Sequence, residues 1–113
     1  MEGLLSSFER TAIAMLTAHT SIDADVQRQL ASVRSVVRSH SEVDSVFTYD
    51  VLSEAQPIVP RDAEMAADLV VRSVGEVSVV LSIEDGFLSQ LIVLAPPRGL
   101  PENPEILGYA QEP

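Results

Sequence analysis

The sequence predicts one α+β domain, with an N-terminal helical hairpin packed on an antiparallel sheet of about four to five strands. Helical periodicity occupies the first 30 residues, β-branched and alternating segments follow it, and Asp85-Gly86 separates two apolar runs. Helices that precede the strands as a block are typical of α+β rather than α/β folds. We therefore assign residues 1–95 to this domain and residues 96–113, which hold five of the seven prolines, to a Pro-rich C-terminal tail.

The first expected helix starts at Ser6 and ends near His19. Ser6 and Glu9 have the spacing of a capping box, in which each side chain satisfies a backbone N–H of the first turn. The apolar side chains of this segment fall within half a turn: Leu4, Leu5, Phe8, Ala12, Ile13, Met15 and Leu16. The pattern predicts an amphipathic helix that lies on a core.

A second helix is expected after a short link, with Ser21 or Asp23 as its N-cap. Ile22, Val26 and Leu30 recur every four residues, which places them on one face. Because the link is short, the two helices are expected to form an αα-hairpin.

Strand patterns begin after the second helix. Residues 33–38 are rich in valine, and residues 45–52 alternate apolar and polar side chains. Residues 53–62 contain two prolines, so we expect a loop there. Residues 69–74 predict a third strand, and the Asp85-Gly86 hairpin supplies the last two.

The Asp85-Gly86 hairpin is the strongest local signal, because both residues suit a positive φ. A two-residue turn predicts that the following pairs face the helices: Ile83–Leu88, Leu81–Gln90, Val79–Ile92 and Val77–Leu94. The opposite face then carries more apolar side chains than a solvated face needs, among them Val80, Phe87, Leu91 and Val93. We expect this face to be the interface of a homodimer, with the C-terminal tail as the alternative cover.

The chain carries a formal charge of −10, from 17 acidic residues and 7 arginines. This charge repels phosphate backbones, so we expect no nucleic acid as a partner and a basic protein instead. No apolar run approaches the roughly 20 residues of a membrane span, and the first residues lack the basic stretch of a secretory signal. The sequence has no cysteine for disulfides, thiol catalysis or thiolate metal sites. A cytoplasmic protein without a membrane partner is the expectation.

Three arginines form the candidate binding site: Arg34, Arg38 and Arg72. If their strands are neighbours, the guanidinium groups form a basic stripe suited to an anion or a carboxylate. The alternative is that they pair across the sheet with acids, namely Asp44, Asp50 and Glu76.

No residue pattern indicates catalysis, a metal or a cofactor. His19 is expected at a helix end and His40 in a solvated turn. Three acid pairs show no sign of the different environments that acid–base catalysis needs: Asp23/Asp25, Asp62/Glu64 and Glu84/Asp85. Phosphate-binding loops and nucleophile motifs are absent from the sequence. We therefore predict a protein that is not an enzyme and assign no catalytic residue, metal ligand or cofactor.

Several short features follow one another in a defined order. They are Phe8-Glu9 in the first helix, Gln27, Gln29 and Leu30 in the second, Arg38 in a strand, Phe47-Thr48 in the next strand, and the Asp85-Gly86 turn. In this order they resemble a group of small, uncharacterised bacterial α+β proteins. The resemblance covers residues 6–95 and implies a fold, with no activity and no site residues.

Two functions are compatible with these observations. The first is a non-enzymatic protein-interaction module, such as an immunity- or antitoxin-like inhibitor of a basic partner. The alternative is a small-ligand-binding or enzymatic domain with an arginine-lined anion pocket, placed between helices and sheet or between sheet and tail.

Overall fold

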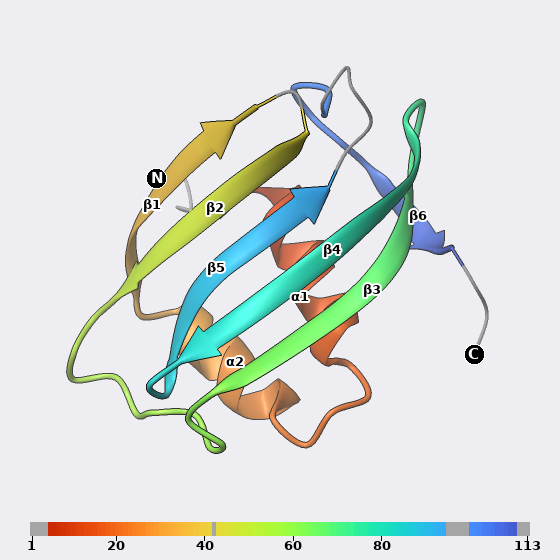
Figure 1. The fold of residues 1–113 in the computed structure, drawn as a ribbon. Coiled ribbons are helices and arrows are strands. Elements are labelled where there is room, and N and C mark those ends of the chain that lie inside the picture. The colour runs from red at the N-terminus through yellow and green to blue at the C-terminus, as the bar shows by residue number, and fades with distance from the viewer. Residues whose placement is uncertain (1–4, 42, 95–99, 111–113) are drawn as a thin grey trace.

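Two helices precede a six-stranded antiparallel sheet in the part of the chain that the computed structural model describes, residues 5–41, 43–94 and 100–110 (Figure 1). The helices are α1 (Ser7–Thr17) and α2 (Asp23–Leu30). The strands are β1 (Val33–His40), β2 (Asp44–Val51), β3 (Ala63–Val71), β4 (Gly75–Glu84), β5 (Phe87–Leu94) and β6 (Ile106–Tyr109). The α+β class is confirmed, and the sheet has one strand more than the largest number we expected.

The additional strand comes from the Pro-rich segment that we expected to lie outside the domain. β6 pairs with β3 in the register Leu69–Tyr109, Val70–Gly108 and Val71–Ile106. Residues 106–109 contain no proline, so each backbone N–H can donate to a neighbouring strand. The strand covers the edge of β3 that a five-stranded sheet would leave open.

The two helices begin in different ways. The Ser6 hydroxyl accepts a hydrogen bond from the Glu9 N–H (3.2 Å), and the Glu9 carboxylate accepts one from the Ser6 N–H (3.0 Å), which confirms the predicted capping box. The N-cap of α2 is Ile22, so our prediction of Ser21 or Asp23 is wrong. The Asp23 carboxylate instead accepts a hydrogen bond from the hydroxyl of Thr17, the last residue of α1 (2.6 Å). Asp23 thereby connects the two helices.

The strands lie in the order β1-β2-β5-β4-β3-β6, and every neighbouring pair is antiparallel. β3 begins at Ala63, earlier than the expected residue 69, because its alternating pattern extends through small and polar side chains. In Figure 1 both helices lie behind the sheet, and no described helix covers the face toward the viewer. We call that face the open face.

The β4–β5 hairpin turns where the sequence predicts, but most of its pairs differ from our expectation. Asp85 and Gly86 have φ values of +53° and +87°. Ile83 pairs with Leu88, as expected, and a bulge next to this pair then shifts the register by one residue. The observed pairs beyond the bulge are Ser82–Gln90, Leu81–Leu91, Val80–Ile92, Val79–Val93 and Ser78–Leu94. The shift moves Leu91 and Val93 to the side of the helices and Ile92 to the open face.

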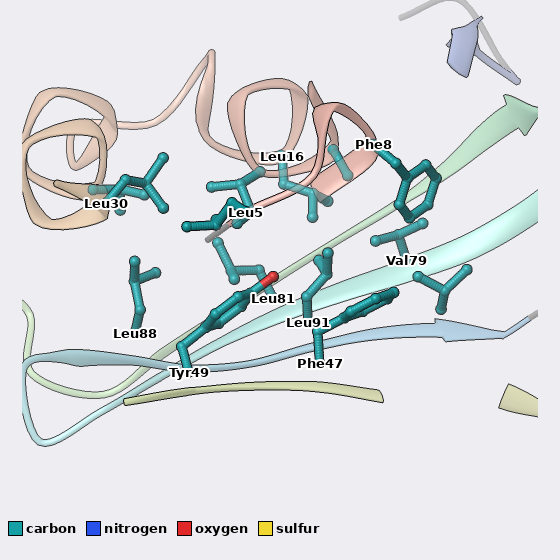
Figure 2. Packing of buried hydrophobic residues seen from close by; sticks show 14 of the residues in the cluster. Leu5, Phe8, Leu16, Leu30, Phe47, Tyr49, Val79, Leu81, Leu88 and Leu91 are labelled. Atoms are coloured by element: carbon teal, nitrogen blue, oxygen red, sulfur yellow. The ribbon is translucent and has the colours of Figure 1, made fainter. Parts of the chain in front are cut away.

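The core lies between the helices and the sheet. Figure 2 shows Leu5, Phe8, Leu16 and Leu30 directed toward the sheet, where Leu81 and other labelled side chains point back. Leu91 and Val93 belong to this cluster and are fully buried (0 % exposed). Burying a side chain of this size contributes about 1.5–3 kcal/mol, so the core accounts for both residues without a second copy of the chain.

The loop between β2 and β3 closes over one end of the sheet. Its Ile58 is fully buried, and the Ile58 N–H donates to the carbonyl of Gly86 (2.7 Å). The buried Gln29 amide of α2 donates to the Gly86 carbonyl (3.0 Å) and accepts from the Leu88 N–H (2.7 Å). The same amide also donates to the carbonyl of Gln56 in the loop (3.2 Å), so one glutamine joins α2, the loop and the hairpin turn. No helix in the described part of the chain has the length and apolarity to cross a membrane.

Candidate functional site

A fully buried carboxylate, Glu9, holds α1 against the first two strands. Its Oε1 accepts a hydrogen bond from the Tyr49 hydroxyl (2.8 Å), and its Oε2 accepts from Arg38 Nη2 (2.7 Å). Oε2 also accepts from the N–H and the hydroxyl of Ser6 (3.0 and 2.9 Å). Because every partner is a donor, the buried negative charge is satisfied.

The sequence contains a signal for this burial. At 100° per residue, Glu9 falls inside the apolar arc of its helix, close to Leu16 and Ile13. We interpreted Glu9 only as half of a capping box, and its partners on β1 and β2 lie 29 and 40 residues away in the chain. Burial, and then the negative charge of Glu9, raise the pKa of Tyr49 far above its usual range, so this phenol remains a hydrogen-bond donor.

Arg38 also lines a cavity of about 740 Å³. The cavity lies between the start of α1, the neighbouring ends of β1 and β2, and residues 100–104 before β6. Its polar wall is formed by Ser6, Ser7, Arg38, His40, Ser41, Ser45, Glu102 and Asn103, and its apolar wall by Phe8, Phe47, Leu100, Pro101 and Pro104. Of the three arginines predicted from the sequence, Arg38 is the one that lies on this wall.

The three arginines do not meet. Arg34 and Arg38 lie on β1, whereas Arg72 follows β3, and the strands β2, β5 and β4 lie between β1 and β3. Arg34 pairs with Asp50 (2.6 Å), as the alternative interpretation expected. Arg72 pairs with Glu105 (3.0 Å), not with Glu76. The hydrogen bond from Arg72, and then the positive charge of Arg72, lower the pKa of Glu105. Both pairs are exposed, so they contribute little to stability.

The two histidines differ in setting. His19 follows α1 and is exposed. His40 ends β1, where its Nδ1 lies 2.8 Å from the Ser45 hydroxyl, and the centroids of its ring and the Phe47 ring lie 6.0 Å apart with the planes at 80°. The contact between His40 and Ser45 joins the neighbouring ends of β1 and β2 at the cavity wall.

The predicted interface residues divide between the two faces of the sheet. Val80 and Phe87 lie on the open face and are half-buried, whereas Leu91 and Val93 lie in the core. The bulge in β5 is the reason for this division. A homodimer through all four side chains is therefore incompatible with the register of the hairpin.

A row of apolar side chains crosses the open face at right angles to the strands. Val46 of β2 pairs with Ile92 of β5, Ile92 pairs with Val80 of β4, and Val80 pairs with Ala66 of β3. We call these four residues the apolar row. Three strand spacings of roughly 4.8 Å give the row a length of about 14 Å.

Acidic side chains surround the apolar row. The described strands place six acids on the open face: Asp44, Asp50, Glu64, Asp68, Glu76 and Glu84. Arg34 is the one base that these strands add, and it already pairs with Asp50. The open face is therefore apolar at its centre and negative around it.

Comparisons with known proteins give no match. No family model, no curated protein and no solved structure matches this chain. Within the described residues, no group of three or more histidine or acidic side chains could hold a metal ion. The cavity and the open face thus remain as the two candidate sites.

Proposed function

We propose that this protein is a non-enzymatic interaction module whose open face binds a basic protein. The observation that carries the proposal is the apolar row with acids around it. Protein interfaces commonly have an apolar centre inside a polar rim, and complementary charge directs the approach of the partner.

The apolar row gives the interaction its stabilising contact. Val46, Ile92 and Val80 are half-buried and Ala66 is exposed, so a partner can remove further apolar surface from water. This burial contributes about 25 cal/mol for each Å² that is covered. A partner segment with apolar side chains along about 14 Å matches the length of the row.

The acids determine which partner fits. Two copies stacked through this face would bring twelve carboxylates together, and like charges in contact are unfavourable. The homodimer expected from the sequence thus receives no support from the charge of this face. A basic partner reverses the sign of the interaction, because lysines and arginines around its apolar segment meet the acids.

An immunity- or antitoxin-like inhibitor is the form of interaction that we favour. A protein whose activity depends on a basic surface is blocked when an acidic face covers that surface. We place this interaction in the cytoplasm.

The test begins with affinity capture from the source cells at low salt, followed by purification of the captured protein. Its affinity is then measured for the wild type, for Val80→Asp and for Glu64→Lys/Asp68→Lys. We expect a basic partner, at least tenfold weaker binding to Val80→Asp, and slower association with the charge-reversed variant. Arg28→Glu is the matched control, because Arg28 is exposed on α2, away from the open face, and pairs with Asp25.

Two results contradict the proposal. One is a partner that binds all four proteins equally. The other is a wild-type dimer that Val80→Asp converts to a monomer, because the open face is then occupied by a second copy of the chain.

A further inference from the structure

We propose that the cavity beside Arg38 binds a small organic monocarboxylate with an apolar body. This site is separate from the open face, because Arg38 is on the helix side of β1 and pairs in register with Phe47 of the core. The inference does not depend on the proposed protein partner.

Ser7, Phe8 and Arg38 supply hydrogen-bond donors to the polar wall near the start of α1. The first N–H groups of a helix have no acceptor within the helix. The Ser6 hydroxyl accepts from the N–H of Glu9, while the N–H groups of Ser7 and Phe8 have no acceptor among the described residues. The Arg38 guanidinium lies on the same wall and is 39 % exposed. Donors of this kind fit a carboxylate, which offers only acceptors.

The charge of Glu9 does not close the site to an anion. Both of its oxygens accept from protein donors, and its side chain is fully buried and is not part of the cavity wall. Glu9 fixes the guanidinium of Arg38 in place, which reduces the entropy lost when a ligand binds. Glu102 adds a negative charge to the wall, so a ligand with one carboxylate is favoured over a dianion.

The rest of the cavity fits an apolar body. Phe8 and Phe47 lie with ring centroids 6.3 Å apart and planes tilted by 45°. Leu100, Pro101 and Pro104 complete the apolar wall. A volume of about 740 Å³ lies within the range of small-molecule sites.

The test compares three probes by isothermal titration calorimetry and amide NMR. They are 2-naphthoate, its neutral analogue 2-naphthamide, and inorganic phosphate. We expect saturable binding of 2-naphthoate, with shifts at Ser7, Phe8 and Phe47, at least tenfold weaker binding of 2-naphthamide, and no binding of phosphate.

Variants separate the carboxylate site from adsorption to the surface. Arg38→Gln should weaken 2-naphthoate at least tenfold and remove its advantage over 2-naphthamide. Arg34→Gln is the matched control on the same strand, because Arg34 pairs with Asp50 away from the cavity. Ser7→Glu covers the case in which Arg38→Gln fails to fold. It adds a negative charge at the cavity, and acids at a helix start are compatible with folding.

The expected result is that Ser7→Glu keeps the circular dichroism of the wild type and loses at least tenfold in 2-naphthoate affinity. Equal affinity for 2-naphthoate and 2-naphthamide overturns the proposal. An unchanged 2-naphthoate affinity in folded Ser7→Glu, or no binding of 2-naphthoate at millimolar concentration, overturns it as well.

Discussion

A double-mutant cycle on Glu9 and Tyr49 tests whether their buried hydrogen bond holds α1 on the sheet. Tyr49→Phe removes the donor to Oε1 and leaves the carboxylate with its bonds to Ser6 and Arg38. Glu9→Leu keeps a side chain of similar size and leaves the buried Tyr49 hydroxyl without its acceptor. The double variant leaves neither group unpaired.

The expected coupling between the two sites is about 1.5–3 kcal/mol, because the bond is 2.8 Å long, buried, and made to a charged acceptor. Glu9→Leu also removes the bonds to Ser6 and Arg38. These losses occur in both the single and the double variant, so they cancel in the cycle. The double variant should therefore be more stable than the sum of the two single changes predicts.

Urea denaturation followed by circular dichroism measures the four unfolding free energies. With an m value of about 1.5 kcal/mol per molar urea, the smallest expected coupling corresponds to about 1 M in the transition midpoint. Tyr109→Phe is the control, because Tyr109 bonds to the Met15 carbonyl and should be additive with Glu9→Leu. A coupling between Glu9 and Tyr49 below about 0.5 kcal/mol would refute the reasoning.

Two further predictions concern the buried Tyr49 hydroxyl and the glycine of the Asp85-Gly86 turn. Burial raises the pKa of Tyr49 in the folded protein above its unfolded value of about 10. The protonated Tyr49 therefore contributes fully to the free energy of unfolding below pH 10, and this contribution is lost as the pH rises further. Denaturation at stepped pH should show a smaller loss of stability above pH 10 in Tyr49→Phe, and equal slopes would contradict this. Gly86→Ala should lower stability by about 1–3 kcal/mol, because φ is +87° and a Cβ would meet Pro57 Cβ at 2.7 Å. Gly75 also has a positive φ, but a Cβ added there would have no neighbouring atom within 4 Å. Thermal denaturation should therefore show a smaller loss of stability for Gly75→Ala than for Gly86→Ala.

Local patterns in the chain predicted much of the architecture. The capping box of α1 involves residues three positions apart, and the Asp85-Gly86 turn depends on two adjacent residues that tolerate a positive φ. Such features depend on short-range hydrogen bonds and backbone preferences, which a sequence displays directly. The class of the fold follows because the helical period and the alternating period occupy separate parts of the chain.

The hairpin shows where local patterns stop being sufficient. The β4–β5 pairing shifts by one residue between Ile83–Leu88 and Ser82–Gln90. Because side chains alternate between the faces of a strand, this bulge moves each later residue of β5 to the opposite face from the one we expected. Leu91 and Val93 consequently pack against the helices, and Ile92 joins the apolar row. The sequence of β5 is apolar on both faces, so it did not determine which face the helices would cover.

The sequence by itself determined the two N-terminal helices, the class of the fold, the hairpin turn and the strongly negative charge. Only the tertiary structure decided that Glu9 binds Arg38 and Tyr49, that Arg72 pairs with Glu105, and that residues 106–109 complete the sheet. Each of these contacts joins residues at least 29 positions apart. Their formation depends on strand order and register, which long-range packing selects and short sequence patterns do not encode.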